Sequence, residues 1–287
     1  MKFIKQACTI VAAIAAIGAS GTASAIMNDW YFNPNGGGLG SAQQINEYLD
    51  INGTAFIDID AGGGGPSFTF TEFGVFNSVQ ADGNGQLFPL NFPGGNITAT
   101  FSASGSGTFN SFFSFDAGGK LDIYQNPTNN QYATSLGIYG ADLGNHIASF
   151  TVLPGGGGLV DASGNPTANG QITVLAYADV GDILLPGYFF DPQGNDLTGS
   201  EVLGFAFTNA NTVGMPTTLQ VSEIICQGAG FTGPGCPSGV GYANSPGDYI
   251  FVSNNGQFKL MEVPEPASVA LLGLGLLGLA GSRFRRK

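Results

Sequence analysis

The middle of the chain alternates apolar and polar residues with a period of two. In residues 67–73, Phe68 and Phe70 fall on one side and the threonines between them on the other, and residues 97–102 repeat the pattern. Such alternation is typical of β-strands with one buried face. With these two, about eleven strands are predicted, and the others cover residues 54–59, 108–115, 121–124, 147–153, 171–178, 202–208, 218–225, 248–253 and 257–263.

Glycine-rich segments separate the predicted strands. The sequence has 47 glycines in 287 residues, without the period of three of a collagen. Residues 41–49, where Ile45 and Leu49 would share a helical face, are the nearest candidate for a helix in the middle of the chain. Many short strands joined by turns favour an all-β fold. We therefore predict a single β-sandwich or jelly-roll-like domain over residues 26–262.

The N-terminus has the pattern of a secretory leader. Two early lysines precede a short apolar run over residues 7–19, and the small-residue motif Ala23-Ser24-Ala25 follows. This order predicts a signal-peptide helix within residues 1–25, cleavage after Ala25 and a mature protein that begins near Ile26. A retained N-terminal helix is the alternative.

Residues 263–287 have three parts. Pro264-Glu265-Pro266 comes first, residues 267–281 form an uncharged hydrophobic run, and four basic residues close the chain: Arg283, Arg285, Arg286 and Lys287. As a helix the run would be roughly 22 Å long at ~1.5 Å per residue. A hydrocarbon core is ~30 Å thick. We therefore expect transient insertion into the inner membrane with the basic tail in the cytoplasm, and a plain C-terminal anchor is the alternative.

The order of these three parts resembles the PEP-CTERM sorting signal of Gram-negative bacteria. The resemblance implies that an exosortase in the inner membrane handles the tail, and that the protein is exported to the cell surface or to the exopolysaccharide matrix. Whether the tail is removed or kept as an anchor stays open. The length, the two terminal signals and the all-β middle also resemble those of flocculation-associated PEP-CTERM proteins, which implies a place in flocs or biofilms.

The charge distribution narrows the choice of partners. Of eight basic residues, only Lys120 and Lys259 lie between the leader and the basic tail, together with all 20 acidic residues, so this segment has a net charge of −18. Such a segment repels phosphate backbones and anionic lipid headgroups. We therefore exclude nucleic acid as a partner and favour divalent cations and neutral or cationic polymers. Solubility alone would also explain the charge.

Two cysteines remain once the leader is removed. Cys226 and Cys236 are close in sequence, and such a pair in an oxidising compartment predicts a disulfide. A metal site would need further ligands, and the single histidine, His146, lies 80 residues before Cys226.

Catalytic motifs are scarce. The sequence has no Gly-x-Ser-x-Gly motif and no glycine-rich loop followed by Gly-Lys-Ser/Thr, and a serine or cysteine nucleophile would have to use His146. Glycoside hydrolysis needs only two carboxylates. Three acidic pairs are close enough in sequence to be candidates: Asp58 with Asp60, Asp179 with Asp182, and Asp191 with Asp196.

One acidic turn is a candidate calcium site. Asp191, Gln193, Asn195 and Asp196 place oxygen atoms at nearly alternate positions around a glycine, as calcium loops do. The same sequence also suits an ordinary hairpin turn. Apart from calcium, we expect no cofactor.

These observations favour a non-enzymatic protein of the cell surface or extracellular matrix, with a role in adhesion, aggregation or exopolysaccharide association. The alternative is a carbohydrate-active sandwich, either a lectin-like binder or a glycan hydrolase. A binder would need exposed aromatic rings, and the aromatic segment Trp30–Phe32 is a candidate unless it packs into the core.

Overall fold

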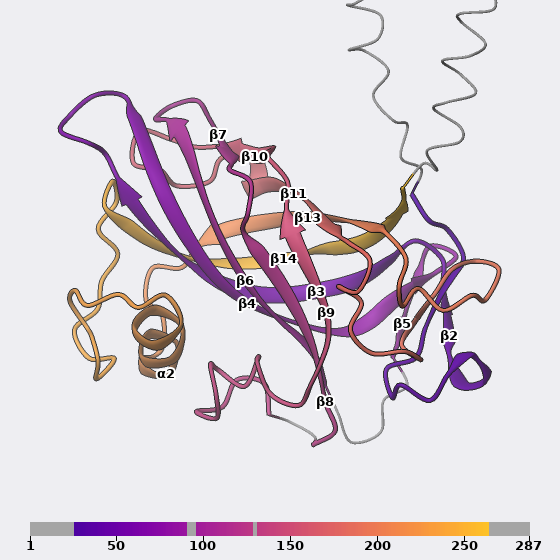
Figure 1. Cartoon of the computed structure of the whole chain (residues 1–287). Coiled ribbons are helices and arrows are strands. Elements are labelled where there is room, and N and C mark those ends of the chain that lie inside the picture. The colour runs from indigo at the N-terminus through magenta and orange to yellow at the C-terminus, as the bar shows by residue number, and fades with distance from the viewer. Residues whose placement is uncertain (1–25, 91–95, 129–130, 264–287) are drawn as a thin grey trace, which may run out of the picture. The chain divides into compact units, whose positions relative to one another are not determined.

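The computed structural model describes residues 26–90, 96–128 and 131–263 (Figure 1). Residues Ile26–Met261 form one compact unit. The predicted cleavage motif with Ala23 and Ala25, and the sorting residues from Pro264 to Lys287, lie outside the described residues, as do the two predicted terminal helices. None of the described helices is both long enough and apolar enough to cross a membrane.

The predicted all-β class is confirmed, and the strands form two sheets. A three-stranded sheet has β1 (Trp30–Phe32) between β2 (Gln43–Ile45) and β12 (Phe189–Phe190). The larger sheet has eleven strands, which are in spatial order β10 (Gly155–Leu159), β7 (Phe112–Phe115), β6 (Asn96–Thr108), β8 (Lys120–Asn126), β9 (Asn145–Val152), β11 (Gln171–Ala178), β13 (Val202–Thr212), β14 (Tyr249–Glu262), β3 (Tyr48–Asp60), β4 (Ser67–Gly83) and β5 (Gln86–Pro89).

The larger sheet closes on itself, which differs from the predicted sandwich. Strand β4 pairs with β3 on one side and with β6 on the other, from Ser67 opposite Thr108 to Ser78 opposite Ile97. Eight strands therefore form a closed ring in the order β3, β4, β6, β8, β9, β11, β13 and β14. Strands β7 and β10 form a second connection between β6 and β11.

The two strands that the sequence predicts at residues 248–253 and 257–263 form one continuous strand in the structure. Strand β14 has 14 residues and continues through Asn254, Asn255 and Gly256. A Cβ atom on Gly256 would lie 2.2 Å from the carbonyl oxygen of Phe207 on β13. Glycine is needed here for close approach of two strands, rather than for a turn.

The strand predicted at residues 218–225 is wrong, because this segment is helical. Helix α2 (Thr218–Gln220) continues as a π-helix, η3 (Val221–Gly228). Thr217 and Gln220 form a capping box, which satisfies backbone N–H groups at the helix start.

Residues 41–49, the predicted helical candidate, instead enter strands β2 and β3 after a short 3₁₀ helix, η1 (Leu39–Ser41). A second 3₁₀ turn, η2 (Ala168–Gly170), precedes β11.

Hydrophobic side chains form three buried clusters. The first joins the three-stranded sheet to the ring and contains Trp30, Phe32 and Phe258. The second contains Phe68 and Phe70 and other residues near β7 and β10. The third lies between the sheet and η3, and includes Phe56, Val75, Val221, Ile224, Ile225 and Phe251. Trp30 and Phe32 are fully buried and belong to the core, and only Tyr31 of this segment is partly exposed, so the three rings do not form an exposed aromatic platform.

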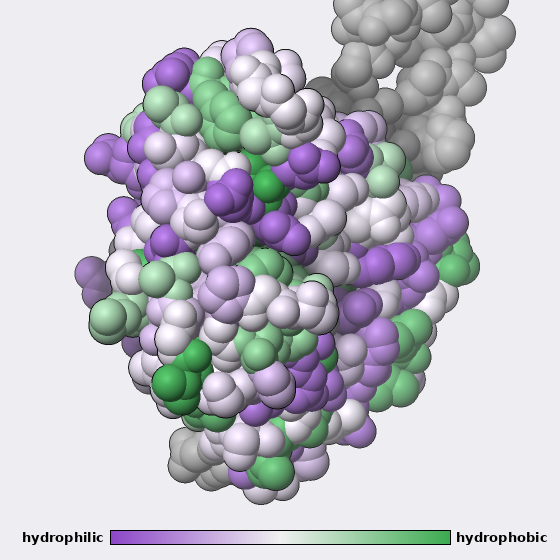
Figure 2. Space-filling view, turned by 90° about the vertical axis from the view of Figure 1, so that its left-hand side faces the viewer, coloured by the Kyte–Doolittle hydropathy of each residue, from purple (hydrophilic) through white to green (hydrophobic). Residues whose placement is uncertain are grey.

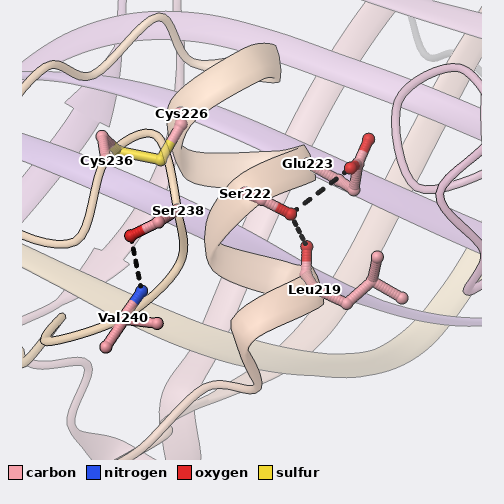
Figure 3. Close-up of a disulfide and its surroundings, with 7 residues drawn as sticks. All are labelled: Leu219, Ser222, Glu223, Cys226, Cys236, Ser238 and Val240. Carbon is pink, nitrogen blue, oxygen red and sulfur yellow. Dashed lines mark hydrogen bonds between the residues drawn. A yellow bond between two sulfur atoms is a disulfide. The ribbon is translucent and has the colours of Figure 1, made fainter.

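The predicted disulfide is confirmed. Cys226 in η3 bonds to Cys236 in the loop that follows, with a Cα–Cα distance of 5.5 Å (Figure 3). Both cysteines pack against the third cluster. The Ser222 hydroxyl donates to the carbonyl oxygen of Leu219 at 3.2 Å, as Figure 3 shows. The disulfide thus fixes an irregular loop to the helix that covers the outer face of the sheet.

Replacing both cysteines by alanine should lower the free energy of unfolding by roughly 2–3 kcal/mol, because the cross-link restricts an 11-residue loop in the unfolded chain. Urea denaturation of the oxidised exported protein and of the C226A/C236A variant measures this difference. Reductant should destabilise the wild type by a similar amount and leave the variant unchanged. Equal stability of the two oxidised proteins would contradict this role.

Candidate functional site

An apolar cavity of about 80 Å³ lies inside the closed sheet. Strands β3, β4, β6, β7, β8, β11, β13 and β14 contribute to its lining. Most lining side chains are aliphatic or aromatic, among them Leu49, Phe101, Leu121, Ile123, Val174 and Phe258. Protein interiors are normally packed with few voids larger than a water molecule. The cavity is therefore the most distinctive internal feature of this domain.

Five buried polar side chains also line the cavity. Two of them, Ser78 on β4 and Thr98 on β6, donate to the backbone carbonyl oxygens of Gln80 and Ala141. Glu72 on β4 is 8% exposed, Thr208 on β13 is 8% exposed and Asn254 on β14 is 7% exposed. Glu72 also lines a neighbouring void of about 20 Å³ together with Phe68 and Phe70. No hydrogen bond or ion pair joins the Glu72 carboxyl group to another described residue.

Burial raises the pKa of Glu72 from 4.5 to about 7. The apolar surroundings disfavour the carboxylate form, and the described residues around it supply no compensating donor or cation. A buried acid with a strongly raised pKa beside a cavity is typical of a functional site. Sequence reasoning missed Glu72, although the alternation that placed Phe68 and Phe70 on one face places Glu72 on the same face one step later.

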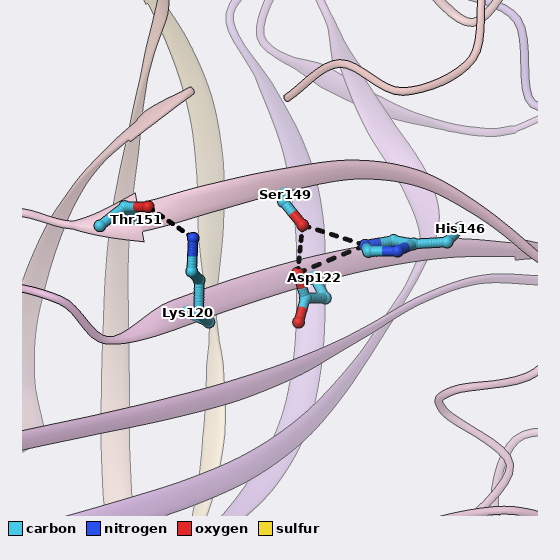
Figure 4. A network of polar contacts seen from close by, with 5 residues as sticks. All are labelled: Lys120, Asp122, His146, Ser149 and Thr151. Carbon is cyan, nitrogen blue, oxygen red and sulfur yellow. Dashed lines mark hydrogen bonds and ion pairs between the residues drawn. The ribbon is translucent and has the colours of Figure 1, made fainter. Parts of the chain in front are cut away.

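The single histidine belongs to a polar cluster on β8 and β9 (Figure 4). The Ser149 hydroxyl donates to Asp122 Oδ1 and lies 3.1 Å from His146 Nε2, and His146 Nε2 lies 3.3 Å from Asp122 Oδ1. The His146 ring also stacks on Tyr124 with a centroid distance of 4.7 Å. Serine and aspartate thus approach the same ring nitrogen. A Ser-His-Asp triad needs them on opposite nitrogens, so the cluster does not have the connectivity of a triad.

The predicted calcium turn forms internal hydrogen bonds. Asp191 Oδ1 accepts from the backbone N–H groups of Gln193 and Asn195 at 2.9 and 2.8 Å, and Asp191 Oδ2 accepts from the Asn195 side chain. Asp196 instead accepts from the backbone N–H groups of Gly187 and Thr198. Among the described residues, no three His, Cys, Asp or Glu side chains are placed to hold a metal ion. Calcium binding at this turn stays a prediction.

One acidic pair gains a third member in the structure. Partial desolvation, followed by the nearby charges of Asp60 and Asp248, raises the pKa of Asp58. The three residues are exposed, and Asp58 on β3 lies opposite Tyr249 at the start of β14. Asp179 and Asp182 instead form a turn, in which the Asp179 backbone N–H donates to Asp182 Oδ2 at 2.9 Å.

The raised pKa of Glu72 predicts that stability falls with pH. The stabilisation from the protonated form is fully present below the unfolded-state pKa of 4.5 and is lost as the pH rises to about 7. The loss is roughly 3 kcal/mol. The E72Q variant should lack this slope in urea denaturation between pH 4.5 and 8, and the exposed-site control D116N should keep it. A slope that persists in E72Q would show that another group causes it.

Residues 262–287 match the family model of the PEP-CTERM protein-sorting motif. The match confirms the motif that Pro264, Glu265 and Pro266 predict together with the hydrophobic run and the basic tail. No curated protein and no solved structure matches the chain. PEP-CTERM motifs are recognised by exosortases, so this is an exported protein that carries an exosortase sorting signal.

Proposed function

We propose that the chain is a non-enzymatic protein of the cell surface or extracellular matrix that promotes adhesion, aggregation or association with exopolysaccharide. The observation that carries the proposal is the sorting motif at residues 262–287 behind a strongly acidic domain. The motif accounts for export, and the acidic surface supplies the means of association.

The described residues contain few cations to balance the carboxylates. Lys259 forms an ion pair with Glu47 and lies 5.6 Å from the centre of the Tyr48 ring. Lys120 donates to the Thr151 hydroxyl at 2.7 Å (Figure 4). In the part of the chain that the structure describes, the only other close contact between an acidic and a basic side chain is that of Asp122 with His146. Most carboxylates in the described residues therefore have no cationic partner, and several of them are exposed.

Unpaired surface carboxylates support association through divalent cations. Calcium binds oxygen ligands from several carboxylates at once, so one ion can join groups on two molecules or on a protein and an acidic polymer. Asp58, Asp60 and Asp248 form such an exposed group. Figure 2 shows that hydrophilic residues are spread over the face in view, with hydrophobic residues in separate small groups. This surface favours ionic over hydrophobic association.

The second candidate function is glycan hydrolysis. A glycosidase needs an acid of raised pKa near a second carboxylate. Asp58 beside Asp60 and Asp248 comes nearest to this arrangement on the described surface. The group is exposed on the sheet, which suits cation bridging better than an enclosed substrate cleft.

Processing is the first test. Mass spectrometry of protein recovered from the cell surface should show an N-terminus at or near Ile26 and loss of the chain beyond Pro264-Glu265-Pro266. Deletion of the exosortase gene should abolish both surface display and C-terminal processing. Surface protein that keeps Arg283, Arg285, Arg286 and Lys287 would contradict removal of the tail.

Deletion of the gene tests the function and should weaken aggregation, attachment or matrix retention. Complementation with the gene should restore them. Calcium should strengthen self-association of the exported protein, and a chelator should reverse it. The variant D58N/D60N/D248N should reduce this calcium effect at least severalfold, because it removes one exposed group of carboxylates. The control D29N/D116N/E201Q removes the same charge from other exposed positions and should have a smaller effect.

The same protein should leave the length of the producer's exopolysaccharide unchanged. Incubation followed by sizing of the polymer measures this directly. Shortening of the polymer that disappears in the single variant D58N would replace the proposed function with glycan hydrolysis.

A further inference from the structure

Surface association leaves the interior of the domain without a role. The cavity of about 80 Å³ is lined by residues of the ring strands and of β7, and its lining is apolar except for a few polar groups. An empty cavity forfeits packing contacts on all sides. The carboxyl group of Glu72, which has no hydrogen-bond partner among the described residues, adds a further cost because burial removes most of its hydration. Both costs disappear if a molecule with an apolar body and a complementary head group occupies the cavity.

We propose that the cavity binds a small lipophilic amine, with its apolar body among the residues of the ring and its amino group at Glu72. The carboxyl group of Glu72 selects the head group. When ionised it only accepts hydrogen bonds, and an ammonium group offers three donors and the opposite charge. A ligand with a carboxylate head would instead place two like charges together in an apolar cavity.

The sheet register indicates that the other buried polar side chains lie at another level of the cavity. Ser78 is six residues from Glu72 on β4, and Thr98 is five residues from Ala103, the residue of β6 that lies opposite Glu72. Glu72 lies opposite Ile57, and Ile57 lies opposite Ile250. Asn254 is four residues further along β14, or roughly 13 Å at ~3.3 Å per residue. Thr208 lies near Asn254, because a Cβ atom on Gly256 would be 2.7 Å from the Thr208 Cα atom. Glu72 is therefore the polar group available to a head group at its end of the cavity.

The volume limits the size of the ligand. A water-sized group takes ~10–15 Å³ on this measure, so about 80 Å³ holds roughly five to eight such groups. This corresponds to an amine with a short alkyl chain, such as butylamine, pentylamine or hexylamine. Longer chains would have to displace side chains that line the cavity, among them the aromatic rings of Phe101 and Phe115.

The test compares probes that share one alkyl chain. Pentylamine, pentanol and pentanoic acid are titrated calorimetrically into the exported protein purified from the producing cells. At pH 8 pentylamine should bind at least tenfold more tightly than pentanol, and pentanoic acid should not bind. At pH 5.5 the preference for the amine should shrink, because Glu72 gains a proton. Glu72 is the only ionisable side chain among the described residues that line the cavity and the void beside it.

Two variants separate recognition by Glu72 from general effects. E72Q should lose the preference for pentylamine at pH 8 and still bind pentanol. A206L keeps Glu72 but fills part of the cavity, so it should lose both ligands. D116N is the control and should bind as the wild type does. Circular dichroism checks that each variant is folded.

Three outcomes would overturn the proposal. In the first, no probe binds the wild type, which would assign the cavity to water. In the second, pentylamine binds equally well to E72Q and to the wild type. In the third, A206L binds as the wild type does, which would place the ligand elsewhere. Because none of these measurements involves aggregation or exopolysaccharide, their failure is distinct from failure of the proposed surface function.

Discussion

The pairing of β4 with β6 is the constraint on which the rest of the structure depends. These two strands join the ends of an arrangement that would otherwise be an open sheet, and twelve residue pairs from Ser67–Thr108 to Ser78–Ile97 connect them. Closure satisfies backbone groups that an open edge would expose. It also gives the sheet an inside, where two hydrophobic clusters pack, and an outside, where η3 covers a third.

Closure also accounts for the position of Glu72. Successive side chains of a strand point to opposite faces, so the register that buries Phe68 and Phe70 buries Glu72 as well. Moving Glu72 outward by a one-residue shift would expose the two aromatic rings and bury Thr69 and Thr71 in their place. Within this fold, the acid is thus retained inside by the packing of its neighbours. The unfavourable burial of one carboxyl group is smaller than the loss of a whole hydrophobic face.

Local signals in the sequence predicted what depends on local chemistry. The disulfide between Cys226 and Cys236, the sorting motif and the β-class all follow from short patterns. The closed ring does not, because β5 separates β4 from β6 in the sequence and no residue in either strand specifies that β4 and β6 pair with each other. The roles of two glycines also depend on strand pairing and could not be predicted from their local sequence. Gly256 resembled a turn residue, and Gly105, whose Cβ atom would lie 2.5 Å from the Phe70 ring, gave no sign that it makes room for that ring. The cavity arises from eight strands together, so its lining was beyond a strand-by-strand prediction.

The composition of the chain links its surface to its interior. With no arginine in the described residues and only two lysines, the protein has no spare cation for a buried acid. Lys259 is held by Glu47, and Lys120 lies at the surface beside Thr151. The charge of Glu72 is therefore balanced either by a proton or by a cation from outside the chain. Near neutral pH the proton is only partly bound, because the pKa of Glu72 is about 7. Basic residues are scarce, so the surface carboxylates are available to external cations. For the same reason, Glu72 in the cavity is available to a cationic ligand.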